Sequence, residues 1–209
     1  MLEVAILAGG EGKRLGTGIK PLLQVCGKPI LLRLLEKLEV LGLKPLIIVH
    51  DEEQKKKIEE ALVNAGVKAG WRVLLDALNK QASIVGIYTA LINASGEVIG
   101  VMPSDTPFLN PAALLRLHDK LKDSDASIPL WPNGYIEPLI AIYRVQPTLR
   151  AVEGSLVRGS FQVSSALRRL RASYVPVSEV FDSPEVETLN INSPEDLERA
   201  EEICANIAR

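Results

Sequence analysis

The sequence predicts an α/β protein, a single Rossmann-like domain over residues 1–209 with three layers (α/β/α) around a mostly parallel, partly mixed central sheet. In its first half, short apolar runs alternate with amphipathic helical patterns, the order that builds parallel sheets. The apolar runs are not interrupted by a polar residue at every second position, which indicates strands covered by helices on both faces. A length of 209 residues suits one compact domain and is too short for two large ones.

The elements follow from these patterns in chain order. Strands are expected where short apolar runs lie between turn residues, at Val4–Leu7, Pro45–Val49, Trp71–Leu75, Val98–Met102, Ala126–Leu130, Leu139–Tyr143, Ser173–Pro176 and Val186–Ile191. Helices are expected where apolar residues recur every third or fourth position, at Ile30–Leu41, Glu52–Asn64, Ser83–Asn93, Pro111–Leu121, Pro147–Val152, Phe161–Arg168 and Pro194–Ile207. The later strands lack full helices between them, so we expect mixed pairing there.

A glycine-rich, basic loop follows the first strand. Residues 7–20 read LAGGEGKRLGTGIK, with Gly9 and Gly10 directly after the strand and Arg14 and Lys20 as cations. Glycines let the backbone turn sharply and expose N–H groups that can bind an anion. Open α/β sheets bind ligands at the carboxyl ends of their strands. The loop therefore predicts a polyphosphate site, and a flexible basic surface loop is the alternative.

The spacing of these glycines excludes two common phosphate loops. Gly10, Gly12 and Gly16 give G-x-G-x-x-x-G, one residue longer than the dinucleotide fingerprint. No Gly-Lys pair is followed by Ser or Thr, as the Walker A pattern requires. The loop instead resembles the L-A-G-G-x-x-x-R-M-G-x-x-x-K signature of nucleotidyltransferases.

Three further polar side chains, two directly after predicted strands and one in the loop after another, should share this edge of the sheet. Asp105 is a lone carboxylate, which can hold Mg²⁺ when substrate phosphates supply the other ligands; a turn or helix cap is the alternative. Asp76 can accept a hydrogen bond from a base amino group or a ribose hydroxyl, or it can serve as a turn residue. His50 is either a nucleoside contact or a half-buried histidine at the rim.

The composition excludes several classes of protein. The formal net charge is −2, so the chain has no global basic field and no nucleic-acid partner is expected. No apolar run approaches the roughly 18 residues of a membrane span, and no leader pattern precedes the first strand. We therefore expect a cytoplasmic protein with no membrane partner. A disulfide between Cys26 and Cys204 is open at this stage, although Cys26 is interpreted as a small buried apolar residue.

Over nearly its whole length the chain resembles the molybdenum cofactor guanylyltransferase family. Five stretches carry the resemblance: LAGGEGKRLG with the lysine at the family's spacing, VLLD at 73–76, PSDTPFLNPAALLRL at 103–117, IEPLIAIY at 136–143 and LNINSPEDL at 189–197. The last two are the more telling, because sugar nucleotidyltransferases do not usually combine them with the first. The resemblance implies transfer of GMP from GTP to the phosphate of molybdopterin, with release of pyrophosphate and dependence on Mg²⁺. It also implies transient contacts with other cofactor-biosynthesis proteins.

The resemblance implies a role for each matching residue on the nucleotide side. The residues that contact the nucleotide or its phosphates are Leu7, Ala8, Gly9, Gly10, Lys20, His50, Asp76 and Asp105. Within this set Lys20 binds phosphate and Asp105 binds the metal, and Arg14 in the same loop faces the triphosphate. Lys20, Arg14 and Asp105 are therefore the expected catalytic residues.

On the acceptor side the resemblance points to two asparagines. Asn190 and Asn192 are two residues apart on a predicted strand, so they should point to one face. The family places them towards the acceptor. The alternative is local, because Ser193 and Asp196 form a helix start that an asparagine can precede as a turn residue.

Some alternatives stay open at this stage. Many family members carry Gly-Pro-Leu-x-Gly after the third strand, where the backbone lies against the base, whereas this chain has Ala82-Ser83-Ile84-Val85-Gly86. A Cβ at position 82 could narrow the base pocket or move its edge, so both GTP and CTP are open. A guanylyl- or cytidylyltransferase for another acceptor, such as cobinamide phosphate, and a non-catalytic nucleotide- or cofactor-binding module also remain. The loop carrying Trp131, Asn133 and Tyr135 either stacks on a pterin or is a turn around a half-buried tryptophan.

Overall fold

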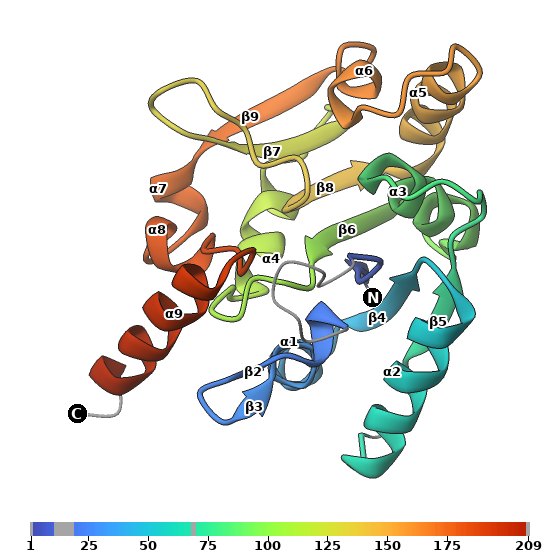
Figure 1. Cartoon of the computed structure of the whole chain (residues 1–209). Coiled ribbons are helices and arrows are strands. Elements are labelled where there is room, and N and C mark those ends of the chain that lie inside the picture. The colour runs from blue at the N-terminus through green and yellow to red at the C-terminus, as the bar shows by residue number, and fades with distance from the viewer. Residues whose placement is uncertain (1, 11–18, 68–69, 208–209) are drawn as a thin grey trace.

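A seven-stranded sheet forms the centre of the computed structural model, which describes residues 2–10, 19–67 and 70–207 (Figure 1). The strand order is β5-β4-β1-β6-β8-β7-β9. The strands are β1 (Glu3–Leu7), β4 (Lys44–Val49), β5 (Arg72–Leu75), β6 (Val98–Pro103), β7 (Ala126–Leu130), β8 (Ala141–Arg144) and β9 (Ala172–Pro176). Neighbouring strands pair in parallel, except that β8 runs antiparallel to both β6 and β7. The prediction of a mostly parallel, partly mixed sheet is confirmed.

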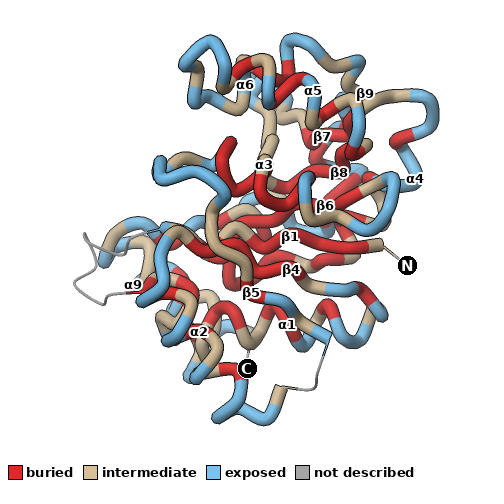
Figure 2. The backbone as a smooth tube through the Cα atoms, turned by 90° about the vertical axis from the view of Figure 1, so that its right-hand side faces the viewer, coloured by how far each residue is buried: buried red, intermediate tan, exposed pale blue. Residues whose placement is uncertain are grey.

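Helices cover both faces of this sheet. One face carries α1 (Ile30–Val40), α2 (Glu52–Asn64), α4 (Ala112–Asp119), α7 (Val177–Val180), α8 (Pro184–Glu187) and α9 (Pro194–Ile207). The other carries α3 (Ser83–Asn93), α5 (Val145–Leu156) and α6 (Val163–Leu167). Figure 2 shows the buried central strands running between the two helical layers. None of the helices in the described ranges is both long and apolar enough to span a lipid bilayer.

Burial on both faces explains the continuous apolar strands. In β1, Val4 and Ile6 pack into the core on one side, whereas Ala5 packs into the core on the other. In β4, Ile47 and Ile48 divide in the same way. Successive side chains of a strand point to opposite faces, so a strand covered twice needs an apolar residue at every position. The predicted three-layer, single-domain architecture is therefore confirmed.

The predicted strand Val186–Ile191 is wrong. Residues 184–187 form the short helix α8, and residues 188–193 are irregular. Pro184 stands at the start of the helix, where its fixed φ and missing N–H are tolerated. The buried carboxylate of Glu187 accepts hydrogen bonds from the backbone N–H groups of Asn110, Asp182 and Ser183 at 3.2, 2.8 and 3.1 Å. The segment is therefore held by the hydrogen bonds of a buried glutamate, and not by the strand pairing that the apolar pattern suggested.

A small hairpin and a disulfide lie beside the C-terminal helix. The hairpin consists of β2 (Gln24–Val25) and β3 (Lys28–Pro29), strands too short to show a sequence pattern, and follows the 3-10 turn η2 (Lys20–Leu22). Its turn residues, Cys26 and Gly27, have φ of +51° and +70°, as a two-residue hairpin turn of type I′ requires. Cys26 is bonded to Cys204 on α9, across 178 residues of sequence. The interpretation of Cys26 as a small buried apolar residue is therefore wrong.

Candidate functional site

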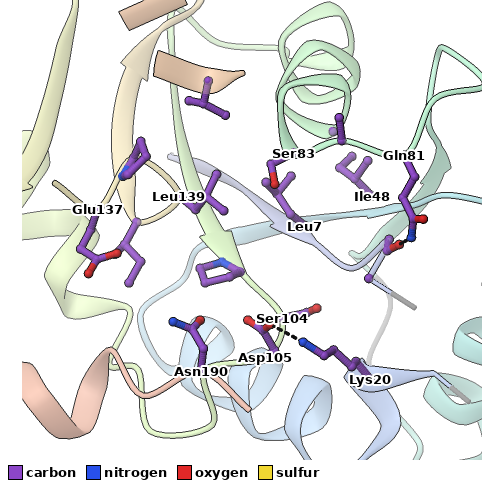
Figure 3. A pocket seen from close by; sticks show the side chains of 18 of the residues that line it. Leu7, Lys20, Ile48, Gln81, Ser83, Ser104, Asp105, Glu137, Leu139 and Asn190 are labelled. Carbon is purple, nitrogen blue, oxygen red and sulfur yellow. Dashed lines mark hydrogen bonds and ion pairs between the residues drawn. The ribbon is translucent and has the colours of Figure 1, made fainter. Parts of the chain in front are cut away.

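A pocket of about 520 Å³ opens at the carboxyl edge of the parallel strands (Figure 3). The loop after β1 contributes Gly9 and Gly10, and the loop after β6 contributes Ser104 and Asp105. Asp76 follows β5, and the start of α3 and the β7–β8 loop supply further walls. Parallel strands bring their carboxyl ends to one edge. The structure therefore brings the predicted rim residues of three strands together.

Lys20, Asp105 and Asn192 form the polar centre of this pocket. Lys20 Nζ donates hydrogen bonds to Asp105 Oδ2 at 3.0 Å and to Asn192 Oδ1 at 2.6 Å. The side chains of Lys20 and Asp105 are 14% and 22% exposed. The ammonium is a compact point charge held between a carboxylate and an amide oxygen, a geometry suited to receiving an anionic phosphate. Three segments remote in sequence thus meet at one cation.

Asn190 and Asn192 both line the pocket, although they are not on a strand. Between them, Ile191 is fully buried, and its backbone N–H donates to the carbonyl oxygen of Asp105 at 2.9 Å. This anchor turns the two asparagines to the pocket side. The local alternative is also present, since Asp196 accepts hydrogen bonds from the backbone N–H groups of Asn192 and Ser193 at 2.8 and 2.9 Å. The prediction of one shared face holds, but its predicted cause, a strand, is wrong.

Asp76 is the buried acceptor of the site. Its side chain is 7% exposed, and His50 Nδ1 lies 3.3 Å from its Oδ2. The Thr89 hydroxyl lies 3.5 Å from its Oδ1. Burial raises the pKa of Asp76, and the hydrogen bond from His50 partly opposes this. Asp76 lines the pocket. His50 is not one of the described residues that line it, and it supports the Asp76 carboxylate through the contact at 3.3 Å.

The residues that follow β1 divide according to their direction. Leu7, Gly9 and Gly10 line the pocket. Ala8 is fully buried, and its backbone N–H donates to the carbonyl oxygen of Ile48 at 2.7 Å, so the structure does not bring Ala8 to the pocket. A Cβ on Gly9 would lie 3.3 Å from His50, which explains the small residue there. Arg14 lies outside the described residues.

The sequence interpretation gave no role to Gln81 or Glu137, which are polar residues of the pocket. Gln81 donates from Nε2 to the carbonyl oxygen of Gly9 at 2.8 Å and so holds the loop after β1. Glu137, on the β7–β8 loop, accepts a hydrogen bond from Trp131 Nε1 at 2.9 Å, and burial raises its pKa. Position within the motif IEPL was the only signal for Glu137. Within this loop Tyr135 lines the pocket, whereas Trp131 packs half-buried against the core.

The raised pKa of Asp76 predicts a stability difference that depends on pH. Because the folded-state pKa of Asp76 lies above 3.8, its ionised carboxylate destabilises the fold. This destabilisation is complete when the pH is above the folded-state pKa, and it is absent when the pH is below 3.8. Asp76→Asn should therefore raise the thermal midpoint relative to wild type at pH 7, and the gain should shrink to nothing as the pH falls towards 3.8. Scanning calorimetry across this range measures the difference.

Asp125→Asn is the matched control for that measurement. The backbone hydrogen bond from Arg171 lowers the pKa of Asp125, so its ionised form stabilises the fold. The control should therefore show the opposite sign, a loss at pH 7 that disappears on acidification. If Asp76→Asn is less stable than wild type at every pH, the burial argument for Asp76 is wrong.

Known proteins resemble this chain over most of its length. The sequence model of a protein family, described as the MobA-like NTP transferase domain, matches residues 4–176. A protein of Methanosarcina mazei named probable molybdenum cofactor guanylyltransferase is 36% identical over 197 residues, which span 92% of this chain and 87% of that protein. The crystal structure of molybdopterin-guanine dinucleotide biosynthesis protein A from Archaeoglobus fulgidus is 31% identical, with a TM-score of 0.82 over 98% of this chain and 100% of that one.

The fold itself is shared more widely. The crystal structure of 2-C-methyl-D-erythritol 4-phosphate cytidylyltransferase from Thermus thermophilus has a TM-score of 0.65 at 17% identity, over 98% of both chains. That likeness concerns the fold alone, so the choice of base and acceptor depends on individual pocket residues. The family match covers most of the chain and the two nearer relatives span almost all of it, and from this we conclude that the chain belongs to the family of MobA-like NTP transferases and is a nucleotidyltransferase.

Proposed function

We propose that this protein transfers GMP from GTP to the terminal phosphate of molybdopterin and releases pyrophosphate. The observation that carries the proposal is the cluster of Lys20, Asp105 and Asn192, where a phosphate-binding cation meets both the rim of the parallel sheet and the segment that holds the two asparagines. The names of the relatives supply the choice of GTP and molybdopterin.

On the nucleotide side, each part of the pocket has a distinct task. The backbone after β1 and Lys20 hold the phosphates, with Arg14 assigned to the same task from its place in the loop. Asp76, supported by His50, accepts a hydrogen bond from the nucleoside. The first residues of α3 line the pocket, and the amino end of that eleven-residue helix favours negative charge nearby.

The residues present fit a magnesium ion that arrives with the nucleotide. Mg²⁺ keeps several waters and takes one or two carboxylates plus substrate phosphates. Asp105 supplies one carboxylate at the pocket, and the described residues contain no group of three or more His, Cys, Asp or Glu side chains that would form a separate cage. When bound, the ion would neutralise charge at the reacting phosphate.

The proposed reaction needs no strong general base. An oxygen of the acceptor phosphate, already anionic near pH 7, forms a bond to the α-phosphorus of GTP. The bond from that phosphorus to the bridging oxygen breaks, and pyrophosphate leaves with the electron pair. Lys20 neutralises charge on the departing phosphates, and the pocket holds the two substrates in line. Catalysis then rests on positioning and charge neutralisation.

Pyrophosphate release separates the functions that the sequence left open. The purified protein should release pyrophosphate from GTP when molybdopterin is supplied anaerobically. Release with cobinamide phosphate instead would assign a different acceptor. Binding of GTP without release, with every acceptor, would assign a non-catalytic module. A clear preference for CTP over GTP would overturn the guanylyl assignment.

The base preference should respond to the residues at the start of α3. Ala82 and Ser83 line the pocket where family members carry Gly-Pro. Ala82→Gly combined with Ser83→Pro removes the Cβ, and proline is tolerated in the first helical turn. We expect the ratio of kcat/KM for GTP over CTP to rise by about 10-fold, the order of effect of one methylene in a pocket. Ser83→Pro alone is the control, and an equal rise with it would refute a role for the Cβ.

We also propose a cytoplasmic location and transient contacts with the proteins that supply and receive the cofactor. Disulfides are rare in cytosolic proteins, with those of hyperthermophiles as an exception. Alkylation of free thiols before cell lysis measures whether Cys26 is reduced or disulfide-bonded in cells. This measurement therefore tests both the cytoplasmic location and the disulfide.

A further inference from the structure

The β7–β8 loop places a carboxylate in the pocket that the proposed reaction does not use. Glu137 lines the pocket, and its Oε1 accepts the indole N–H of Trp131 at 2.9 Å. Its backbone is fixed as well, since its N–H donates to the carbonyl oxygen of Pro129 at 3.0 Å and its carbonyl oxygen accepts from Ile140 at 3.1 Å. Glu137 is therefore a preorganised hydrogen-bond acceptor at the pocket wall.

Glu137 stands at the end of the pocket opposite the nucleoside side. In Figure 3, Gln81 and Ile48 lie at the right end and Glu137 lies at the left end, whereas Asp105 and Lys20 lie below them, with Lys20 nearer to the Gln81 end. Asn190 lies on the same side as Glu137. The proposed function places the phosphates at Lys20 and the nucleoside at the Gln81 end. The Glu137 end is then left for the acceptor molecule, whose own phosphate reaches the reacting centre from that side.

The chemistry of this end suits a flat ring with adjacent N–H donors. A carboxylate is acceptor-only and can receive two parallel N–H groups. Among the described residues, Glu137 forms no ion pair, so a neutral donor edge fits it better than a second anion. Tyr135, 59% exposed, lines the pocket two residues before it, and an aromatic face can stack on a ring. Pro138 and Leu139 add apolar wall.

We propose that Glu137 recognises the 2-amino-4-oxo pyrimidine edge of a pterin acceptor, by accepting hydrogen bonds from its ring N–H and its exocyclic amine. This inference rests on the proposed function, because it names part of its acceptor site. Guanine carries the same donor edge, but its place at the nucleoside end directs it away from Glu137.

Glu137→Gln separates recognition from a structural role. The glutamine keeps an oxygen that can accept from Trp131, so a residue that only supports the loop would tolerate the change. For a ligand, however, the amide replaces one acceptor by a donor that opposes the pterin amine. We expect KM for molybdopterin to rise about 10–100-fold, with kcat within about 2-fold and the Kd of GTP unchanged.

The control and the contrary outcomes are specific. Glu153→Gln, at an exposed position on α5, should behave as wild type. If Glu137→Gln does not fold, Glu137→Asp keeps the charge but withdraws it by one methylene, and it should raise the same KM. An unchanged KM in a folded variant, or a weaker Kd for GTP in place of the KM effect, would overturn the inference alone. No pyrophosphate from the wild-type protein with GTP and molybdopterin would instead overturn the proposed function.

Discussion

Asp105→Ala is expected to lower kcat/KM for nucleotidyl transfer by about 10²–10³-fold, equivalent to about 2.7–4 kcal/mol of lost transition-state stabilisation. Asp105 is the carboxylate assigned to the metal, and its Oδ2 also sets the position of Lys20 Nζ at 3.0 Å. Truncation therefore removes one charge and releases another. The fold should survive, because the contact that anchors Ile191 uses the backbone carbonyl of Asp105 and not its side chain.

Pyrophosphate release at varied Mg²⁺ measures this effect. The concentration of Mg²⁺ that gives half-maximal rate should rise in the variant, since one protein ligand is gone. Asp182→Ala is the matched control: it removes a largely exposed carboxylate, which pairs with Arg116 on the surface, and should leave the rate unchanged. Near-normal turnover by a folded Asp105→Ala protein would refute the metal assignment.

Much of the pocket edge at the carboxyl ends of the strands was predictable because the signals are local. Strands buried on both faces show as unbroken apolar runs, and α2 begins where predicted because Asp51 caps it, accepting the backbone N–H of Gln54 at 2.8 Å. Once the strands are parallel, their carboxyl ends share an edge, which places Asp76 and Asp105 in one pocket. No side-chain contact between them has to be known in advance.

The rest depended on contacts that sequence spacing does not reveal. Lys20 and Asn192 are 172 residues apart and meet only because Ile191 is anchored to the loop after β6. Ala8 belongs to the same motif as its neighbours, yet its direction turns it into the core. Glu137 looks like an ordinary loop glutamate until the fold of the β7–β8 loop turns its side chain to the pocket.

Reducing the Cys26–Cys204 disulfide is expected to lower the free energy of unfolding by about 3–5 kcal/mol. The bond closes a loop of 178 residues, and in the chain-entropy model a long loop restricts the unfolded chain most. The hairpin and α9 also meet without the bond: the backbone N–H of Cys26 donates to Glu201 Oε1 at 2.9 Å, and Val25 and Ala200 belong to the same buried core cluster.

Urea unfolding with and without reductant measures the loss, and serine variants isolate its cause. Cys26→Ser with Cys204→Ser removes the bond while keeping a non-glycine residue at the left-handed φ of +51°, so the backbone cost at position 26 is unchanged. The double variant should match the reduced wild-type protein and should not respond to reductant.

The hairpin follows Lys20 directly, and α9 follows Asn192, so the same loss of restraint should loosen the Lys20–Asn192 contact and raise KM for the substrates. A shift in stability below about 1 kcal/mol on reduction would contradict the prediction that this bond stabilises the fold by restricting the unfolded chain.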